Sequence, residues 1–181
     1  MIYPATEIVL KNGKNAIFRS PKKEDAAEMI EYLKKTSGET VFIMRYPEEC
    51  GYTIEDEEEI LESKRLSDRE VMIACEIDGR IAGNCNLMFN RHIKTAHRAT
   101  VAIALLKEYW GMGIGSAMFE EMIKIARDRG VLQMELQFVE GNDRARHLYE
   151  KFDFRIAGII PDAIRLKDGT LLNEYHMIKK L

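Results

Sequence analysis

Apolar residues recur along the chain at two different spacings, and these spacings separate predicted strands from predicted helices. Short apolar or alternating runs predict strands over residues 8–10, 16–19, 71–77, 81–89, 98–105, 132–139, 155–160 and 171–178. Apolar positions at helical spacing predict helices over residues 21–37, 53–64 and 114–127. The alternation of both kinds of element indicates a mixed α/β fold.

Two turns join neighbouring strands. Asp78-Gly79 lies between the strands over 71–77 and 81–89 and predicts a tight hairpin, because this pair adopts the turn that twisted antiparallel strands require. Asn12-Gly13 predicts a turn within the opening strand region, which is one strand or a small hairpin. After residue 160, Pro161-Asp162 predicts another turn, followed by a short strand.

Capping residues mark the ends of the first two helices. Ser20 before Pro21 predicts a helix start, with the hydroxyl as N-cap and the proline in the first turn. Gly38 is expected to end this helix. Thr53 followed by Asp56 is a capping-box pattern for the second helix.

The stretch from Val101 to Arg127 is the most informative part of the chain. It predicts a buried strand, a turn with glycines at 111, 113 and 115, and an amphipathic helix that Gly130 follows. Glycine lets a ligand approach the main chain closely, and backbone amides at a helix start favour an anion. The strand over 132–139 should then run parallel to the first one. The sequence therefore predicts a phosphate-binding turn, although an ordinary glycine-rich turn stays open.

Two common phosphate-binding motifs do not fit this turn. A nucleoside-triphosphate loop requires Gly-Lys followed by Ser or Thr, and no glycine here has that neighbour. A dinucleotide fingerprint requires a third glycine where the chain has Ser116 or Met118. Glu135 has the separation of a ribose-binding acid but lies inside the next apolar run rather than at its end.

A third motif matches better. The segment WGMGIGSAM at 110–118 resembles the pyrophosphate-binding turn of the GNAT superfamily of acetyl-CoA-dependent N-acetyltransferases. The downstream segment from Leu132 to Phe154 resembles the next GNAT block, with four residues in register: Asn142, Ala145, Tyr149 and Phe154. Two residues depart from the pattern, since Trp110 replaces a usual Gln or Arg and Asp153 replaces a common Gly.

The resemblance covers most of the chain and implies a fold and a co-substrate. It implies an α/β (α+β) GNAT fold, with a central mixed, mostly antiparallel twisted sheet flanked by helices and two splayed parallel central strands. Acetyl-CoA or CoA would bind in the gap between those strands, without a metal. The cofactor-binding residues implied are Ile103, Ala104, Leu105, Trp110, Gly111, Met112, Gly113, Ile114, Gly115, Ser116, Asn142, Ala145 and Tyr149.

Acetyl transfer to an amine requires a polarised carbonyl, a neutral amine and a proton for the departing thiolate. The resemblance implies that Tyr149 is the general acid, and its alternative role is that of a core tyrosine. The backbone amide of Leu105 is the candidate donor to the carbonyl oxygen. The base is open between His97, Glu174, Glu76 and a tyrosine-held water. A GNAT-shaped module that binds acyl-CoA as a sensor, without turnover, is the alternative function.

Charge and composition narrow the partners. The net charge of −3 argues against a nucleic-acid-binding surface, and no apolar run is long enough to cross a membrane. The chain has three cysteines without metal-ligand spacing, which favours reduced thiols and a cytoplasmic location. We expect a single GNAT domain over 1–181, with homodimer formation left open.

The acceptor is expected to be the primary amine of a small molecule or peptide. The loop after the first predicted helix and the second predicted helix together carry the densest acidic stretch in the chain, over residues 48–62. If that stretch bordered the acceptor site, it would favour a cationic amine, and otherwise it is a solvated helix face.

Overall fold

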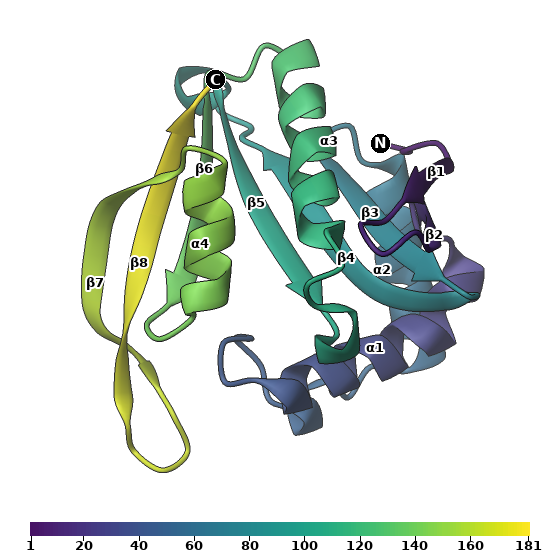
Figure 1. Ribbon diagram of the computed structural model, residues 1–181, viewed down its shortest axis with the longest axis horizontal. Helices are drawn as coiled ribbons and strands as arrows, with labels where there is room; N and C mark the ends of the chain where they lie inside the picture. Colours follow the sequence, from purple (N-terminus) through teal and green to yellow (C-terminus); the bar gives the residue numbers. More distant parts are fainter.

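The computed structural model describes residues 1–181 as an eight-stranded sheet with helices on both faces (Figure 1). The strands follow the order β1-β2-β3-β4-β5-β6-β8-β7, and only β5 and β6 pair in parallel. Helix α3 lies in front of the sheet in the view of Figure 1, and α2 lies behind it. This is the mixed, mostly antiparallel sheet that the GNAT resemblance implied, so the predicted fold class is confirmed.

The structure contains eight strands and four α-helices. The strands are β1 (Thr6–Val9), β2 (Asn15–Arg19), β3 (Glu70–Ile77), β4 (Arg80–Phe89), β5 (Arg98–Leu105), β6 (Gln133–Val139), β7 (Arg155–Arg165) and β8 (Leu171–Lys180). The α-helices are α1 (Ala26–Glu39), α2 (Ile54–Leu66), α3 (Ile114–Asp128) and α4 (Asp143–Lys151). None of the helices is both long and apolar enough to cross a membrane.

The central strands β5 and β6 pair over only part of their length. Their register runs from Arg98 opposite Gln133 to Thr100 opposite Glu135 and then stops. Glu135 accepts a hydrogen bond of 2.6 Å from Arg98 across this paired end. Beyond Thr100 the strands separate, as predicted, and the backbone of β5 is exposed to a gap.

Helix α3 packs its apolar side on the sheet and closes one half of the core. Ile114, Met118, Phe119 and Met122 have at most 1% of their surface exposed. Burial of each such side chain stabilises the fold by about 1.5–3 kcal/mol. A second, smaller core lies against α1 and α2 and includes Met29, Leu61, Met72 and Leu106. The sheet is thus held from both faces, and the gap between β5 and β6 remains open between them.

One hairpin turn and one helix cap follow the sequence prediction. Asp78 and Gly79 both have positive φ, at 51° and 75°, as a tight hairpin turn of this type requires. Thr53 caps α2, accepting a hydrogen bond of 3.1 Å from the Asp56 amide, while the Asp56 carboxylate accepts one from the Thr53 amide.

The predicted start of the first helix is wrong. Ser20 is buried and links the segment before β1 to strand β3, since its hydroxyl accepts from the Tyr3 amide and donates to the Met72 carbonyl. The α-helix begins at Ala26, after a short 3-10 turn in which Asp25 accepts a hydrogen bond from the Lys22 amide. A hydroxyl that would suit a cap is therefore used for a tertiary contact. The helix also passes through Gly38 and ends one residue later.

The predicted turn at Pro161-Asp162 is also wrong. β7 continues through these residues to Arg165, and its pairing with β8 is irregular between Ile160 and Ile164. Asp162 has a φ of 50°. Proline and a residue with positive φ fit a bulge in an edge strand as well as a turn, because neither has to donate to the ladder there.

Candidate functional site

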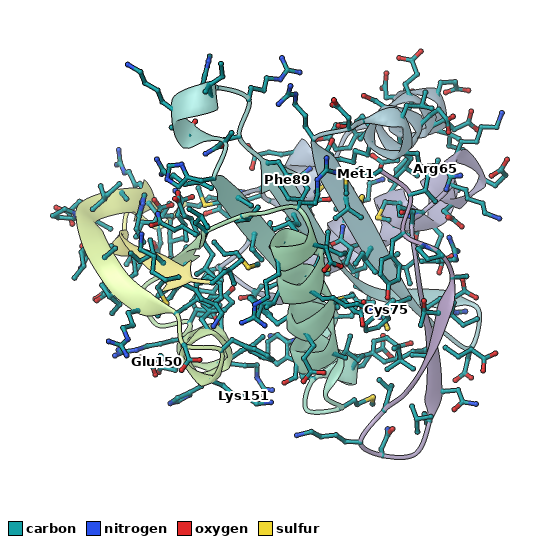
Figure 2. The ribbon with its side chains drawn as sticks, turned by 90° about the horizontal axis from the view of Figure 1, so that it is seen from above. Met1, Arg65, Cys75, Phe89, Glu150 and Lys151 are labelled. Atoms are coloured by element: carbon teal, nitrogen blue, oxygen red, sulfur yellow. The ribbon has the colours of Figure 1, made fainter.

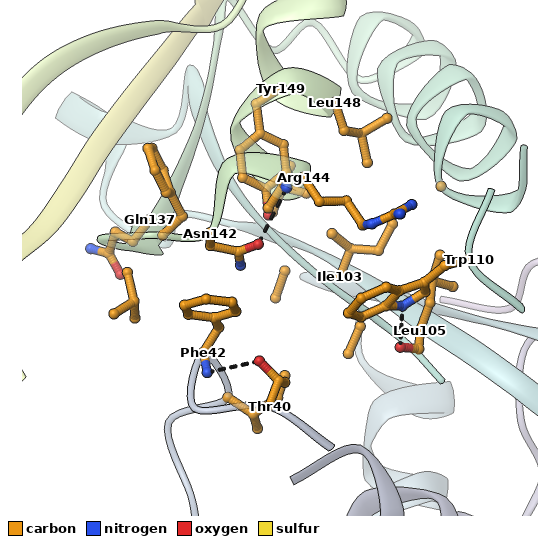
Figure 3. Close-up of a pocket in the computed structure, with 18 of the residues that line it drawn as sticks. Thr40, Phe42, Ile103, Leu105, Trp110, Gln137, Asn142, Arg144, Leu148 and Tyr149 are labelled. Carbon is orange, nitrogen blue, oxygen red and sulfur yellow. Dashed lines mark hydrogen bonds between the residues drawn. The ribbon is translucent and has the colours of Figure 1, made fainter. Parts of the chain in front are cut away.

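A cavity of about 540 Å³ opens where β5 and β6 separate (Figure 3). Its walls come from β5, the glycine turn, the start of α4 and the loop after α1. Phe42 from that loop lies beside Asn142 in the view of Figure 3, and its ring is 3.8 Å from the position that a Cβ would take at Gly141. The site therefore joins segments that are far apart in the sequence.

The glycine turn forms one end of this cavity, and its three glycines serve different purposes. Gly111 and Gly113 have φ values of 80° and 90°, which side chains rarely tolerate. Gly115 lies inside α3, and a Cβ there would come within 3.0 Å of Leu148 on α4. A larger residue at 115 would therefore have to displace the Leu148 side chain.

The backbone at the start of α3 is free to bind an anion. The first helical hydrogen bond runs from the Ala117 amide to the Gly113 carbonyl, at 3.0 Å. The amides of residues 114–116 consequently have no intrahelical acceptor, and the helix dipole is positive at this end. No neighbouring atom lies within 4 Å of the position that a Cβ would take at Gly111. The turn therefore fits a pyrophosphate.

Most of the predicted cofactor-binding residues line the cavity. They are Ile103, Ala104, Leu105, Trp110, Gly111, Gly113, Gly115, Ser116, Asn142, Ala145 and Tyr149. Two do not. Ile114 is 1% exposed and packs in the core, and Met112 packs against the same core, so only their backbone can serve the turn.

Trp110 occupies the motif position where Gln or Arg was expected. Its indole nitrogen donates a hydrogen bond of 3.0 Å to the Leu105 carbonyl, which ties the turn to the end of β5. The Arg144 guanidinium lies 4.8 Å from the centre of the Trp110 ring, in reach of a cation–π contact. The side chain at 110 is neutral, so positive charge comes from Arg144 on α4 instead (Figure 3).

The end of β5 presents backbone groups to the cavity. The Leu106 amide bonds to the Ala82 carbonyl on β4, at 3.0 Å. Because successive residues of a strand point their backbone groups to opposite sides, those of Ile103 and Leu105 face the gap. An extended amide-containing ligand can pair with this edge.

Tyr149 is held by aromatic side chains and opens onto the cavity. Its ring centre lies 5.6 Å from that of Phe119 and 6.1 Å from that of Phe138. Burial raises the pKa of Tyr149 to about 12. The Tyr149 hydroxyl has no hydrogen-bond partner. Asn86 Oδ1 is the one polar side-chain atom that is both fully buried and without a partner, so the Tyr149 hydroxyl is not fully buried. The neutral phenol of Tyr149, whose proton is not donated to any protein group, therefore faces the cavity.

The three side chains considered as the base differ in their position relative to the cavity. His97 precedes β5 at its opposite end, where its carbonyl accepts from the Leu132 and Gln133 amides, and it does not line the cavity. Glu76 binds Arg19 and is also outside. Glu174 on β8 lines the cavity and lies 2.8 Å from His176 Nε2. Of the three side chains considered, Glu174 alone is in position.

The acidic stretch over 48–62 does not line the cavity. Glu48 pairs with Lys167, and Glu49 and Asp56 accept hydrogen bonds from backbone amides near helix starts. Glu57 is buried at 3% exposure, and that burial raises its pKa. These acids lie outside the cavity lining, and several have local partners, while the hypothesis that the stretch borders the acceptor site stays a prediction.

The sequence analysis missed three features of the site. The loop over residues 40–44 contributes Phe42, Ile43 and Met44, whose sequence showed no clear periodicity. Lys11, from the turn between β1 and β2, lines the cavity beside Gly113. Lys151 reaches from the end of α4 and donates a hydrogen bond of 2.9 Å to Ser116 at the start of α3 (Figure 2). Their contribution depends on how distant segments pack together.

A splayed parallel pair beside an open amide turn is the arrangement that the GNAT resemblance implied. The sequence model of the acetyltransferase (GNAT) family matches residues 27–154. The chain belongs to this family.

The chain is also similar to individual proteins. It is 28% identical over 120 residues to the L-amino acid N-acetyltransferase AaaT of Escherichia coli, covering 64% of this chain and 73% of that one. It superposes on a GNAT-family acetyltransferase from Streptococcus pneumoniae with a TM-score of 0.85 at 29% identity, over 92% and 99% of the two chains. The fold also matches yncA from Salmonella typhimurium, solved with its cofactor acetyl-CoA (TM-score 0.78, 18% identity, 92% and 94% of the chains).

Proposed function

We propose that this protein transfers the acetyl group of acetyl-CoA to a primary amine of a small molecule or peptide, by direct attack of the amine on the thioester. The observation that carries the proposal is the free Tyr149 hydroxyl, which faces the same cavity as the open glycine turn. The proposed general acid and the glycine turn that would bind the anion thus lie in the same cavity. Family membership supports acetyl transfer in general.

Residues of this chain would divide the chemistry among them. The glycine-turn amides would hold the pyrophosphate, and the edge of β5 would pair with the pantetheine arm. The Leu105 amide would donate to the thioester carbonyl oxygen. With a pKa near 12, Tyr149 keeps its proton at neutral pH and would donate it to the sulfur as the thiolate leaves.

Glu174 is the proposed base. An alkylamine with a pKa of about 10.4 is protonated at neutral pH, so the site has to remove a proton before attack. Glu174 is the only acidic residue that lines the cavity, and its side chain is 17% exposed. Its contact with His176, whose side chain is 37% exposed, offers a route for the proton toward solvent. One carboxylate also favours an acceptor with positive charge.

The test is thiol release from acetyl-CoA over a panel of amines that includes spermidine, a lysine peptide and a neutral and an acidic amino acid. We expect release with at least one amine and a preference for cationic ones. Glu174→Gln should lower turnover by about 10²–10⁴-fold, the usual range for a general base. Glu150→Gln is the matched control, because Glu150 is half-exposed on α4 and pairs with Arg146 outside the cavity.

The outcomes separate three conclusions. CoA binding without release for any amine would replace the enzyme with a sensor module. Release that survives Glu174→Gln would keep the acetyltransferase and remove Glu174 as its base. Equal rates for spermidine and an acidic amino acid would remove the cationic preference.

A further inference from the structure

The turn between β1 and β2 lies directly against the glycine turn. The Lys11 amide donates a hydrogen bond of 3.2 Å to the Met112 carbonyl. The Lys11 stem runs across Gly113, where an added Cβ would lie 3.0 Å from Lys11 Cγ and 3.3 Å from Cδ. A glycine at 113 therefore allows the positive φ and also leaves room for this lysine.

The Lys11 ammonium has no partner of its own. It makes no hydrogen bond and no ion pair, although the residue lines the cavity. Lys14 provides the contrast within the same turn: its ammonium lies 3.8 Å from Asp78, and it does not line the cavity. A free cation beside three unpaired helix-start amides is placed to meet an anion.

The charge balance of the site points to the same residue. Lys11 and Arg144 are the only lysine or arginine side chains that line the cavity. Arg144 lies over the Trp110 ring, and the position that usually supplies a polar or cationic side chain is occupied by that neutral tryptophan. Lys151, which donates to Ser116, is not part of the cavity lining. Pyrophosphate carries more than one negative charge, so neutral amides and the Arg144 guanidinium leave charge for a further cation inside the cavity.

We propose that Lys11 binds the pyrophosphate of CoA and replaces the side-chain contact that the motif loses at Trp110. The hairpin of β1 and β2, at the edge of the sheet, is then a cofactor-binding element as well as a structural one. This inference rests on the proposed use of acetyl-CoA. It assigns Lys11 to binding, with no part in the chemical step.

The experiment is calorimetric titration of CoA and of 3′-dephospho-CoA into wild type, Lys11→Ala, Lys11→Arg and Lys14→Ala. Lys11→Ala should raise the Kd for both ligands by about three- to tenfold, as expected for one solvent-accessible charge contact. Lys11→Arg should recover most of the affinity, and Lys14→Ala should match wild type. The loss should shrink as salt rises, because the contact is exposed and therefore screened.

A second readout separates binding from structure. With acetyl-pantetheine, which lacks the pyrophosphate, Lys11→Ala and wild type should turn over equally. Equal CoA affinity in Lys11→Ala and Lys14→Ala would overturn the proposal, as would a loss confined to CoA and absent with 3′-dephospho-CoA. An equal loss with acetyl-pantetheine would make Lys11 structural. If wild type binds no CoA at all, the proposed function fails instead.

Discussion

Replacement of Tyr149 by phenylalanine isolates one hydroxyl in the proposed mechanism. The substitution keeps the ring contacts to Phe119, Phe138 and Phe154, whose ring centres lie 5.6, 6.1 and 6.4 Å away. Each aromatic pair contributes about 0.5–1.5 kcal/mol beyond its buried area, so packing is preserved. The hydroxyl forms no hydrogen bond, so its loss leaves no buried partner unpaired. We therefore expect a change in the free energy of unfolding within about 0.5 kcal/mol.

The effect on turnover should be much larger than the effect on stability. Loss of one general acid lowers the rate by about 10²–10⁴-fold, which corresponds to about 3–5 kcal/mol in the activation barrier. Because burial raises the pKa of Tyr149 to about 12, the phenol stays protonated throughout the usual assay range. The pH–rate profile should therefore fall uniformly in the variant and keep its shape.

The assay is single-turnover acetyl transfer, which reports chemistry separately from product release, together with titration of CoA. Tyr175→Phe is the matched control, because Tyr175 stacks on the same Phe138, at 5.0 Å, but does not line the cavity. Near-normal single-turnover rates in Tyr149→Phe would refute the general-acid role. An equal fall in both variants, or a parallel loss of stability, would assign the hydroxyl to structure.

Two further predictions follow from the glycine turn and from the Arg19–Asp25 pair. Gly113→Val should weaken CoA binding at least tenfold, since the valine side chain would enter the turn and displace Lys11. Gly169→Val is the control: its φ of 89° is similar, so it should lose as much stability as Gly113→Val but keep its affinity for CoA. Unchanged CoA affinity in folded Gly113→Val would refute the placement of the pyrophosphate. Asp25→Asn should lower the free energy of unfolding at pH 7 by about 1–3 kcal/mol. Burial opposes ionisation of Asp25, but hydrogen bonds from Arg19 and the Lys22 amide outweigh the effect of burial and hold the carboxyl pKa below its usual value. That stabilisation is complete above the unfolded-state pKa of about 3.9 and is lost as pH falls through the lower folded-state pKa. Urea unfolding midpoints of variant and wild type should thus converge as pH falls below the unfolded-state pKa, and a constant difference across this range would contradict the assignment.

Local backbone chemistry was readable from the sequence. The Asp78-Gly79 turn, the Thr53 capping box and the glycine turn were each predicted from residues within a few positions of one another. Such features depend on φ preferences and on hydrogen bonds between near neighbours, which the residue types largely determine. The predicted splay of the central strands came from the family resemblance rather than from periodicity.

Tertiary packing decided the features that depend on distant partners. Ser20 has the residue type of a helix cap, but its hydroxyl contacts Tyr3 and Met72, so the first helix starts later. Pro161 suits a turn, but pairing with β8 carries the strand through it. In both cases long-range hydrogen bonds outweighed a local preference. At Ser20 the reason is that a buried polar group without a partner is costly, and at Pro161 it is that β7 pairs with β8 on both sides of the irregularity.

The candidate site shows the same division. Residue types located the glycine turn, and the family resemblance located Tyr149, because both belong to one continuous segment around the strand–helix–strand crossover. It did not distinguish Glu174 from His97, and it did not indicate Lys11, because strand order and the contact between two distant turns decide which side chains reach the cavity. Reach into a shared cavity is a property of the folded chain, since it depends on distances that residue spacing does not fix.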